Sequence, residues 1–159
     1  MRARAESLAK QFEGRVTEMT TAIERLSDAD WKKLTAAEKW SVGVTAHHVA
    51  GAHRPIEDIV KAVATGQATP PYTMAMLAEM NAKHAREFAG CTKAETAALH
   101  KQGALAAAAT VRGLSDAQLD RSGVIMTGMA PMTVQQIVEG VLIGHLDEHR
   151  RSIRATVGD

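Results

Sequence analysis

The sequence predicts an all-α fold, a four-helix bundle with short connecting helices, from three observations. Of the 159 residues 45% are hydrophobic but only 3% are aromatic, so the core must consist mainly of alanine, aliphatic residues and methionine. Several long segments repeat apolar residues every three or four positions, which is the period of an amphipathic helix. Some of these segments follow a Ser or Thr with Glu or Gln three residues later, the pattern of a helix start. We expect one domain over residues 1–159.

Composition excludes several classes of partner. Nineteen basic and eighteen acidic residues give a formal charge of +1, and the basic residues are scattered, so no nucleic-acid partner is expected. The chain has no apolar run of about 18 residues, so no membrane span is expected. The lone Cys91 cannot form an internal disulfide, which is consistent with a reducing cytoplasm as the compartment.

The first half of the chain predicts two long helices. An apolar stripe predicts the first, which ends before Ser27: Leu8, Phe12, Val16, Met19, Ile23 and Leu26. Thr35 and Glu38 have the spacing of a capping box, which predicts a helix start or only a short turn before Trp40. Ser41 is the predicted N-cap of the second long helix, and Gly66 is its predicted end.

The second half predicts three further helices. One is expected from about Thr73 to Phe88, and the next from Thr92 to about Val111; the two could also be one bent helix. The last helix has the best start signal in the chain, because Thr133 and Gln136 form a reciprocal capping box.

The last predicted helix carries the histidine pair His145 and His149. Histidines four residues apart lie on one face of an α-helix, and here that face continues through the apolar residues Val134, Ile137 and Val141. A histidine pair on a core face is either buried with hydrogen-bond partners or bound to something. The pair alone is a weak signal, and a chance pair with one buried and one solvated histidine is the plain alternative.

His48 makes a metal site the stronger interpretation of that pair. It falls on the apolar stripe of the second predicted helix, so three imidazoles could converge inside the bundle. Neutral imidazole is a ligand for zinc, nickel, copper or iron, and three protein ligands leave further positions for water or substrate. We therefore predict that His48, His145 and His149 hold a divalent metal of the catalytic kind.

The remaining polar candidates are weighed against their structural roles. His47 points about 100° away from His48 around the helix and is expected to be a half-exposed packing residue. We expect His53 and His100 to be solvated, although His53, beside Pro55, could also line the mouth of a pocket. Asn81 and His84 could reach the cavity around the metal or be satisfied by neighbouring helices.

Two further sets of residues leave alternatives open. Asp147 and Glu148 could accept a hydrogen bond from a metal ligand or pair with Arg150 or Arg151. Six methionines near the linkers could fill the core or form an adaptable apolar wall for a hydrophobic substrate: Met74, Met76, Met80, Met126, Met129 and Met132.

Two stretches resemble the DinB-like superfamily. The segment Trp40-Ser41-Val42-Gly43-Val44-Thr45-Ala46-His47-His48 is similar to its tryptophan-led second helix, whose metal histidine lies eight residues after the tryptophan. Residues 128–137, followed by His145-Leu146-Asp147-Glu148-His149, resemble its last helix with paired histidines. The resemblance implies a DinB-like four-helix bundle with up-down-down-up connections. It also implies a three-histidine site at His48, His145 and His149, with zinc or nickel foremost and iron possible, and frequent homodimers.

The resemblance also implies a range of activities. Such relatives include S-transferases that use mycothiol, bacillithiol or glutathione, and mycothiol-dependent maleylpyruvate isomerases. In some of those isomerases a glutamate replaces one histidine of the last helix, whereas this chain has His145 and His149. This difference favours the general DinB-like or S-transferase branch, and the activity we expect is that of a metal-dependent thiol S-transferase with a small-molecule thiol and an electrophile as partners. The alternatives are a metal-hydroxide hydrolase and a non-catalytic bundle whose metal is structural, sensory or absent.

A homodimer has one candidate surface in the sequence. Leu142, Ile143 and Leu146 lie off the main stripe of the last helix, so they could face a second copy or be buried within the monomer.

Overall fold

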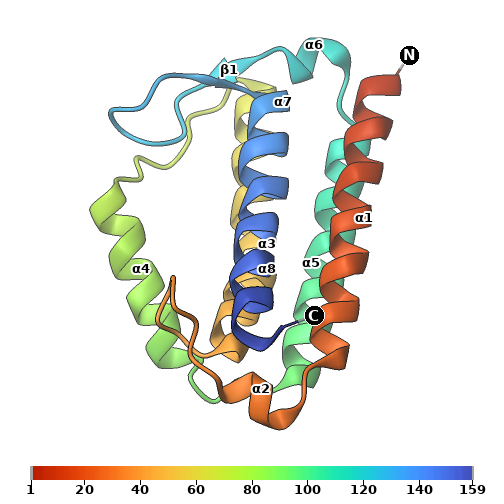
Figure 1. Cartoon of the computed structure of the whole chain (residues 1–159). Coiled ribbons are helices and arrows are strands. Elements are labelled where there is room, and N and C mark those ends of the chain that lie inside the picture. The colour runs from red at the N-terminus through yellow and green to blue at the C-terminus, as the bar shows by residue number, and fades with distance from the viewer. Residues whose placement is uncertain (1, 159) are drawn as a thin grey trace.

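A computed structural model describes residues 2–158, in which the long helices run side by side (Figure 1). The bundle consists of α1 (Ala3–Arg25), α3 (Val42–Thr65), α5 (Lys93–Arg112) and the last helix, which runs through α7 (Val134–Ile137), η1 (Val138–Ile143) and α8 (Gly144–Val157). α1 packs against α5, α5 against α3 and α3 against α8, while η1 and α8 close back on α1. The predicted all-α four-helix bundle is confirmed.

The order of the helices requires a long return connection. α3 and α5 run in the same direction, and α1 and α8 run in the opposite direction, so the chain must cross back between α3 and α5 (Figure 1). α4 (Met74–Glu87) makes this return outside the bundle and contacts it through α3. Phe88 to Thr92 separate α4 from α5, which decides against one bent helix. All of α4 is described, and none of its residues is fully buried.

Short elements close the two ends of the bundle. α2 (Asp28–Lys32) lies at one end, and α6 (Asp116–Leu119) lies at the other. β1 (Ser122–Gly123) pairs antiparallel with β2 (Met132–Thr133), so the segment between them forms a loop beside the start of α7. Within residues 2–158, no helix combines the length and the apolar character that a membrane crossing requires.

Most of the predicted helix boundaries are confirmed by their caps. The Ser41 side chain accepts a hydrogen bond from the Val44 amide, and Gly66 ends α3 with a φ of 72°. Both partners of the capping boxes at Thr92 and Thr133 make their reciprocal hydrogen bonds. After Thr35, where the spacing predicts a helix start or only a short turn, residues 36–38 form the short turn.

The last helix departs from a regular α-helix in its middle. η1 is a π-helix, whose wider turn holds more residues than an α-turn, so the core stripe advances five residues from Ile137 to Leu142 instead of four to Val141. The stripe continues through Leu146, and Val141 is only half-buried. His145 therefore lies at the side of the core stripe and not on it.

The same shift decides whether the three apolar residues off the predicted stripe face a second copy or the core of the monomer. Leu142, Ile143 and Leu146 are buried within the monomer, so they offer no dimer surface.

Candidate metal centre

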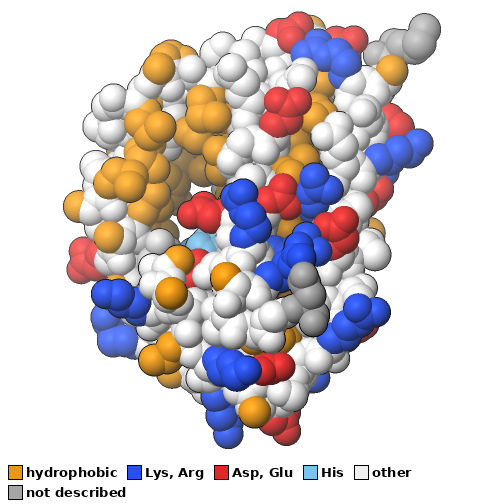
Figure 2. All heavy atoms as spheres, in the orientation of Figure 1, with side chains coloured by type: hydrophobic (Ala, Val, Ile, Leu, Met, Phe, Trp, Pro, Cys, Tyr) orange, Lys and Arg blue, Asp and Glu red, His pale blue; other side chains and the backbone are white. Residues whose placement is uncertain are grey.

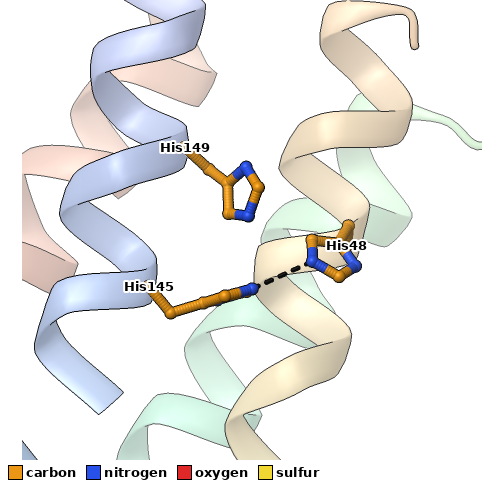
Figure 3. Close-up of side chains that lie close together, drawn as sticks. All are labelled: His48, His145 and His149. Carbon is orange, nitrogen blue, oxygen red and sulfur yellow. Dashed lines mark hydrogen bonds between the residues drawn. The ribbon is translucent and has the colours of Figure 1, made fainter. Parts of the chain in front are cut away.

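Three histidines from two helices converge beside the core (Figure 3). His48 comes from α3, and His145 and His149 come from successive turns of α8. Their three possible ligand nitrogens lie within 4.8 Å of one another, and the Nε2 atoms of His48 and His145 are 2.9 Å apart. The structure thus brings together the three residues that the sequence predicts for the site.

Burial keeps the imidazoles of His48 and His145 neutral. Desolvation, and then the neighbouring imidazoles, lower the pKa of His48 to about 3. The pKa of His145 falls to about 3, again mainly through desolvation and then through His149. At neutral pH both rings are therefore uncharged, which is the protonation state in which imidazole binds a metal.

The donor set fits a divalent metal. Two Zn–N bonds of about 2.0–2.1 Å in tetrahedral geometry separate their nitrogens by about 3.3 Å. That separation lies between the 2.9 Å of His48 and His145 and the 4.8 Å that bounds the whole group. Side-chain adjustments of about 1 Å would bring all three nitrogens to one ion. The cluster indicates a divalent metal, and its three nitrogens match the ligand preferences of zinc, nickel or iron.

Glu38 lies behind His149 and was missed in the sequence. The His149 Nδ1–H donates to Glu38 Oε1 over 2.8 Å, and the Ser152 hydroxyl donates to Glu38 Oε2 over 2.5 Å. Burial opposes its charge, but hydrogen bonds from Ser152, Thr35 and His149 hold the pKa of Glu38 below its usual value. The spacing of Thr35 and Glu38 left a helix start or a short turn open, and the structure forms the turn.

The sequence offers Asp147 and Glu148 either as acceptors for a metal-binding histidine or as partners of Arg150 or Arg151. Asp147, however, forms an ion pair with Arg15 at 3.0 Å, and Glu148 is exposed. Glu38 is 111 residues from His149 in the chain, so no local spacing could relate the two. Only the fold reveals their contact.

The surface of the molecule is hollowed beside α4. Figure 2 shows this hollow on the α4 side of the bundle, with hydrophobic side chains gathered on its walls and a histidine visible at its base. Four of the six methionines near the linkers are exposed, which decides against core filling for them: Met74, Met76, Met80 and Met129. Met126 and Met132 are half-buried.

α4 reaches the site through His84. Its Nε2 lies 2.8 Å from His47 Nδ1, its ring centroid lies 5.7 Å from that of His48, and Phe88 stacks on His47 at 4.1 Å. His84 therefore has a partner on a neighbouring helix for Nε2 and also borders the site, whereas its buried Nδ1 has no hydrogen-bond partner among the described residues. Asn81 lies on the same half-buried face. His47 is 7% exposed, less than the half-exposure that was predicted.

His53 and His100 form a second histidine pair inside the bundle. His53 Nε2 and His100 Nδ1 are 2.9 Å apart, and His100 Nε2 lies 3.3 Å from the Val16 carbonyl oxygen. Both rings are fully buried, so the prediction that they are solvated is wrong. α3 packs against α5 as well as α8 and therefore buries two faces, and the alanine-rich α5 shows no stripe that could mark its inner side.

Comparison with known proteins assigns the family. The model of the mycothiol maleylpyruvate isomerase N-terminal domain matches residues 12–148. The chain belongs to this family. The matched range includes His48 and His145 and ends one residue before His149. No curated protein matches the chain by sequence.

Solved structures similar to this family member share its fold. A mycothiol-dependent maleylpyruvate isomerase aligns with a TM-score of 0.76 at 12% identity, over 96% of this chain and 61% of the isomerase. A variant of that isomerase aligns with a TM-score of 0.75 at 11% identity, over 94% of this chain and 60% of the other. The chain thus spans about three fifths of the isomerase.

A third solved structure aligns with this chain over a larger share of its own length. YfiT of Bacillus subtilis, described as a probable metal-dependent hydrolase with an unusual four-helix bundle topology, aligns with a TM-score of 0.79 at 18% identity, over 98% of this chain and 86% of YfiT. These likenesses confirm the DinB-like four-helix bundle.

Proposed function

We propose that His48, His145 and His149 bind a divalent metal and that the protein is a metal-dependent thiol S-transferase. One observation carries this proposal: three imidazoles, of which burial holds those of His48 and His145 neutral, present their nitrogens to one another within 4.8 Å. Zinc or nickel is the proposed metal, and iron is compatible with the same ligands. Three protein ligands would leave further coordination positions for water or substrate.

The metal supplies one kind of chemistry to this site. When bound, it would act as a Lewis acid that lowers the pKa of a low-molecular-weight thiol or a water molecule. The neutral histidines contribute no positive charge, so the charge of the ion is not opposed by its own ligands. Glu38 adds a negative charge behind His149.

The hollow would receive the electrophile. Hydrophobic side chains gather on its walls, and the exposed Met74, Met76 and Met80 belong to α4 on the same side of the bundle. Methionine side chains are flexible and polarisable, so they adapt to apolar molecules of different shapes. Apolar walls also exclude water from the reacting atoms, which strengthens electrostatic interactions there. We therefore propose an electrophile with a substantial apolar portion.

The relatives support a thiol as the co-substrate. The family model and the two isomerase structures are named for mycothiol, and the last helix of this chain carries histidine at both ligand positions. The isomerase activity itself is not proposed, because this chain spans about three fifths of that protein. A reducing cytoplasm is the compartment we propose, since a free thiol persists there.

Hydrolysis is the second candidate function. YfiT, a probable metal-dependent hydrolase, matches this chain over 86% of its own length. The same site would then act on a water molecule in place of a thiol.

A transferase assay tests the proposal. The protein is loaded with Zn²⁺ or Ni²⁺, and conjugation of mycothiol, bacillithiol or glutathione to a chromogenic electrophile is followed by absorbance. We expect turnover with at least one thiol, loss of turnover in His145→Ala, and unchanged turnover in His53→Ala. Equal activity in His145→Ala and the wild type would refute the metal mechanism, whereas ester hydrolysis without thiol transfer would favour the second candidate.

A further inference from the structure

The connection between α2 and α3 is a tight hairpin, residues 33–41, beside the histidines. Leu34 and Ser41 form an isolated antiparallel bridge. The Thr35 amide donates to the Trp40 carbonyl over 2.8 Å, and the Val42 amide donates to the Lys33 carbonyl over 2.8 Å. These bonds fix the path of the backbone over the whole hairpin.

Lys39, at the end of the hairpin turn, shows how firmly the backbone is held. Its φ of 62° lies in the left-handed region, which costs an L-residue about 1–2 kcal/mol. Such a conformation persists only where the surrounding structure determines it, and it is often found next to functional groups. The hairpin therefore holds its side chains in one arrangement at some cost in stability.

Glu38 uses both of its oxygens on α8. Oε1 accepts from His149 Nδ1 and Oε2 accepts from the Ser152 hydroxyl, and the side chains of Glu38 and His149 are 9% and 11% exposed. An ionised carboxylate can only accept hydrogen bonds. The proton in this contact must therefore be on His149 Nδ1, and when the ring carries no second proton its lone pair is on Nε2.

Trp40 places a second contact on the histidines from the same hairpin. Its ring lies edge-on to the ring of His48, with centroids 5.1 Å apart and an interplanar angle of 62°. His48 comes from α3, whereas His149 comes from α8. One hairpin thus contacts histidines from both helices of the cluster.

We propose that Glu38 is the positioning residue of the metal centre. Its carboxylate holds His149 as the Nδ1–H tautomer with Nε2 directed at His48 and His145 before a metal binds, while Trp40 limits the rotation of His48. This inference rests on the proposed role of the three histidines as metal ligands. Loss of a carboxylate partner behind a histidine ligand typically weakens metal binding about 10- to 100-fold.

Metal affinity of the whole chain tests this role. Zn²⁺ binding is measured by competition with a chromophoric chelator for the wild type, Glu38→Ala and Glu38→Gln. We expect Glu38→Ala to raise the Kd about 10- to 100-fold. Glu38→Gln should recover most of the affinity, because its amide oxygen can still accept from Nδ1 while the Ser152 hydroxyl accepts from its NH₂ group.

Glu57→Ala is the matched control. The Glu57 carboxylate is buried to the same degree, with 7% of the side chain exposed, and it accepts from Thr110 over 2.6 Å and from Lys61 over 2.7 Å. Its loss should lower stability without changing the Zn²⁺ affinity. Equal affinities of Glu38→Ala and the wild type, or an equal loss of affinity in Glu57→Ala, would overturn the proposal.

The tautomer of His149 gives a second measurement that does not require a variant or a metal. In metal-free protein labelled with ¹⁵N-histidine, two-bond nitrogen–proton NMR correlations should show His149 as the Nδ1–H form. The Nε2–H form, or an equal mixture, would overturn the role of Glu38. If the wild type shows the Nδ1–H form but binds no Zn²⁺, the metal function fails while the positioning contact stands.

Discussion

Two groups of histidines each include one residue of α3: His48 in the candidate metal centre, and His53 in the core pair with His100. His48 and His53 are five residues apart, but the two groups differ in how their nitrogens are arranged. In the core pair, His100 must donate from Nε2 to the Val16 carbonyl, so its Nδ1 accepts from His53 Nε2. This is a linear chain in which each proton has an acceptor. In the group of His48, His145 and His149, the nitrogens face a common point, and the acceptor Glu38 stands behind the group.

Burial alone does not separate the two groups. The pKa values of His48, His145 and His53 each fall to about 3, in every case mainly through desolvation. The difference lies in whether a protein acceptor completes the network. A completed chain needs nothing further, whereas the one hydrogen bond between His48 Nε2 and His145 Nε2 leaves the nitrogen that His149 directs at them to a further donor or a cation. Connectivity, and not a perturbed pKa, therefore marks the candidate site.

The largest expected effect is the stability that a metal adds. At a free Zn²⁺ concentration about 1,000 times its Kd, the wild type should gain about 4 kcal/mol in the free energy of unfolding. His48→Ala should lose this increment, and His53→Ala should keep it although its starting stability is lower. Urea unfolding with Zn²⁺ and with a chelator measures both. If Zn²⁺ adds equally to the free energy of unfolding of His48→Ala and His53→Ala, the proposed difference between the two histidine groups is wrong.

Single substitutions of His53 or His100 should lower the free energy of unfolding by less than the loss of the metal does. His53→Leu or His100→Leu leaves one buried imidazole without its partner, which costs about 1–3 kcal/mol. The double variant removes both polar groups and should lose less than the sum of the single losses. Urea unfolding of the three metal-free variants gives the coupling energy. Strictly additive losses would contradict a linked pair.

Acid should act on the core pair in a defined pH window. His53 has a pKa near 3 in the folded protein and an ordinary value of 6.5, so the unfolded chain binds more protons between these values. The contribution of His53 to the free energy of unfolding is complete above pH 6.5. It is lost as the pH falls toward 3, at up to about 1.4 kcal/mol per pH unit. Unfolding of the metal-free double variant should show a shallower acid slope than the wild type. Identical slopes would exclude the pair as the cause.

The smallest expected effect lies in the hairpin beside the metal centre. Lys39→Gly removes the penalty of the left-handed conformation and should stabilise the metal-free protein by about 0.5–1 kcal/mol, after the entropy cost of glycine. Lys33→Gly, in the same hairpin, is the control and should destabilise. Thermal unfolding distinguishes the two. A loss of stability in Lys39→Gly would show that the backbone is not strained there.

The sequence predicts the parts of the molecule that depend on local spacing. The apolar stripe of α1, the capping boxes at Thr92 and Thr133 and the end of α3 at Gly66 are confirmed. The three site histidines also follow from spacing, since His145 and His149 are one turn apart and α3 presents His48 to them.

What the sequence misses depends on contacts between distant segments. Glu38 meets His149 only after the hairpin folds over α8, and the capping-box spacing at Thr35 concealed its role. The burial of His100 could not be predicted because every face of α5 carries small residues. The π-turn of η1 shifts the core stripe by one residue, which simple helical periodicity cannot anticipate.

The metal content of the protein as purified from cells tests the central claim most directly. Samples prepared without chelators are analysed by mass spectrometry for zinc, nickel and iron, in parallel with His145→Ala and His53→Ala. We predict about one divalent metal ion per chain in the wild type and in His53→Ala, and a large loss in His145→Ala. A wild type without stoichiometric metal that also fails to take up Zn²⁺ or Ni²⁺ would contradict the account, as would full metal content in His145→Ala.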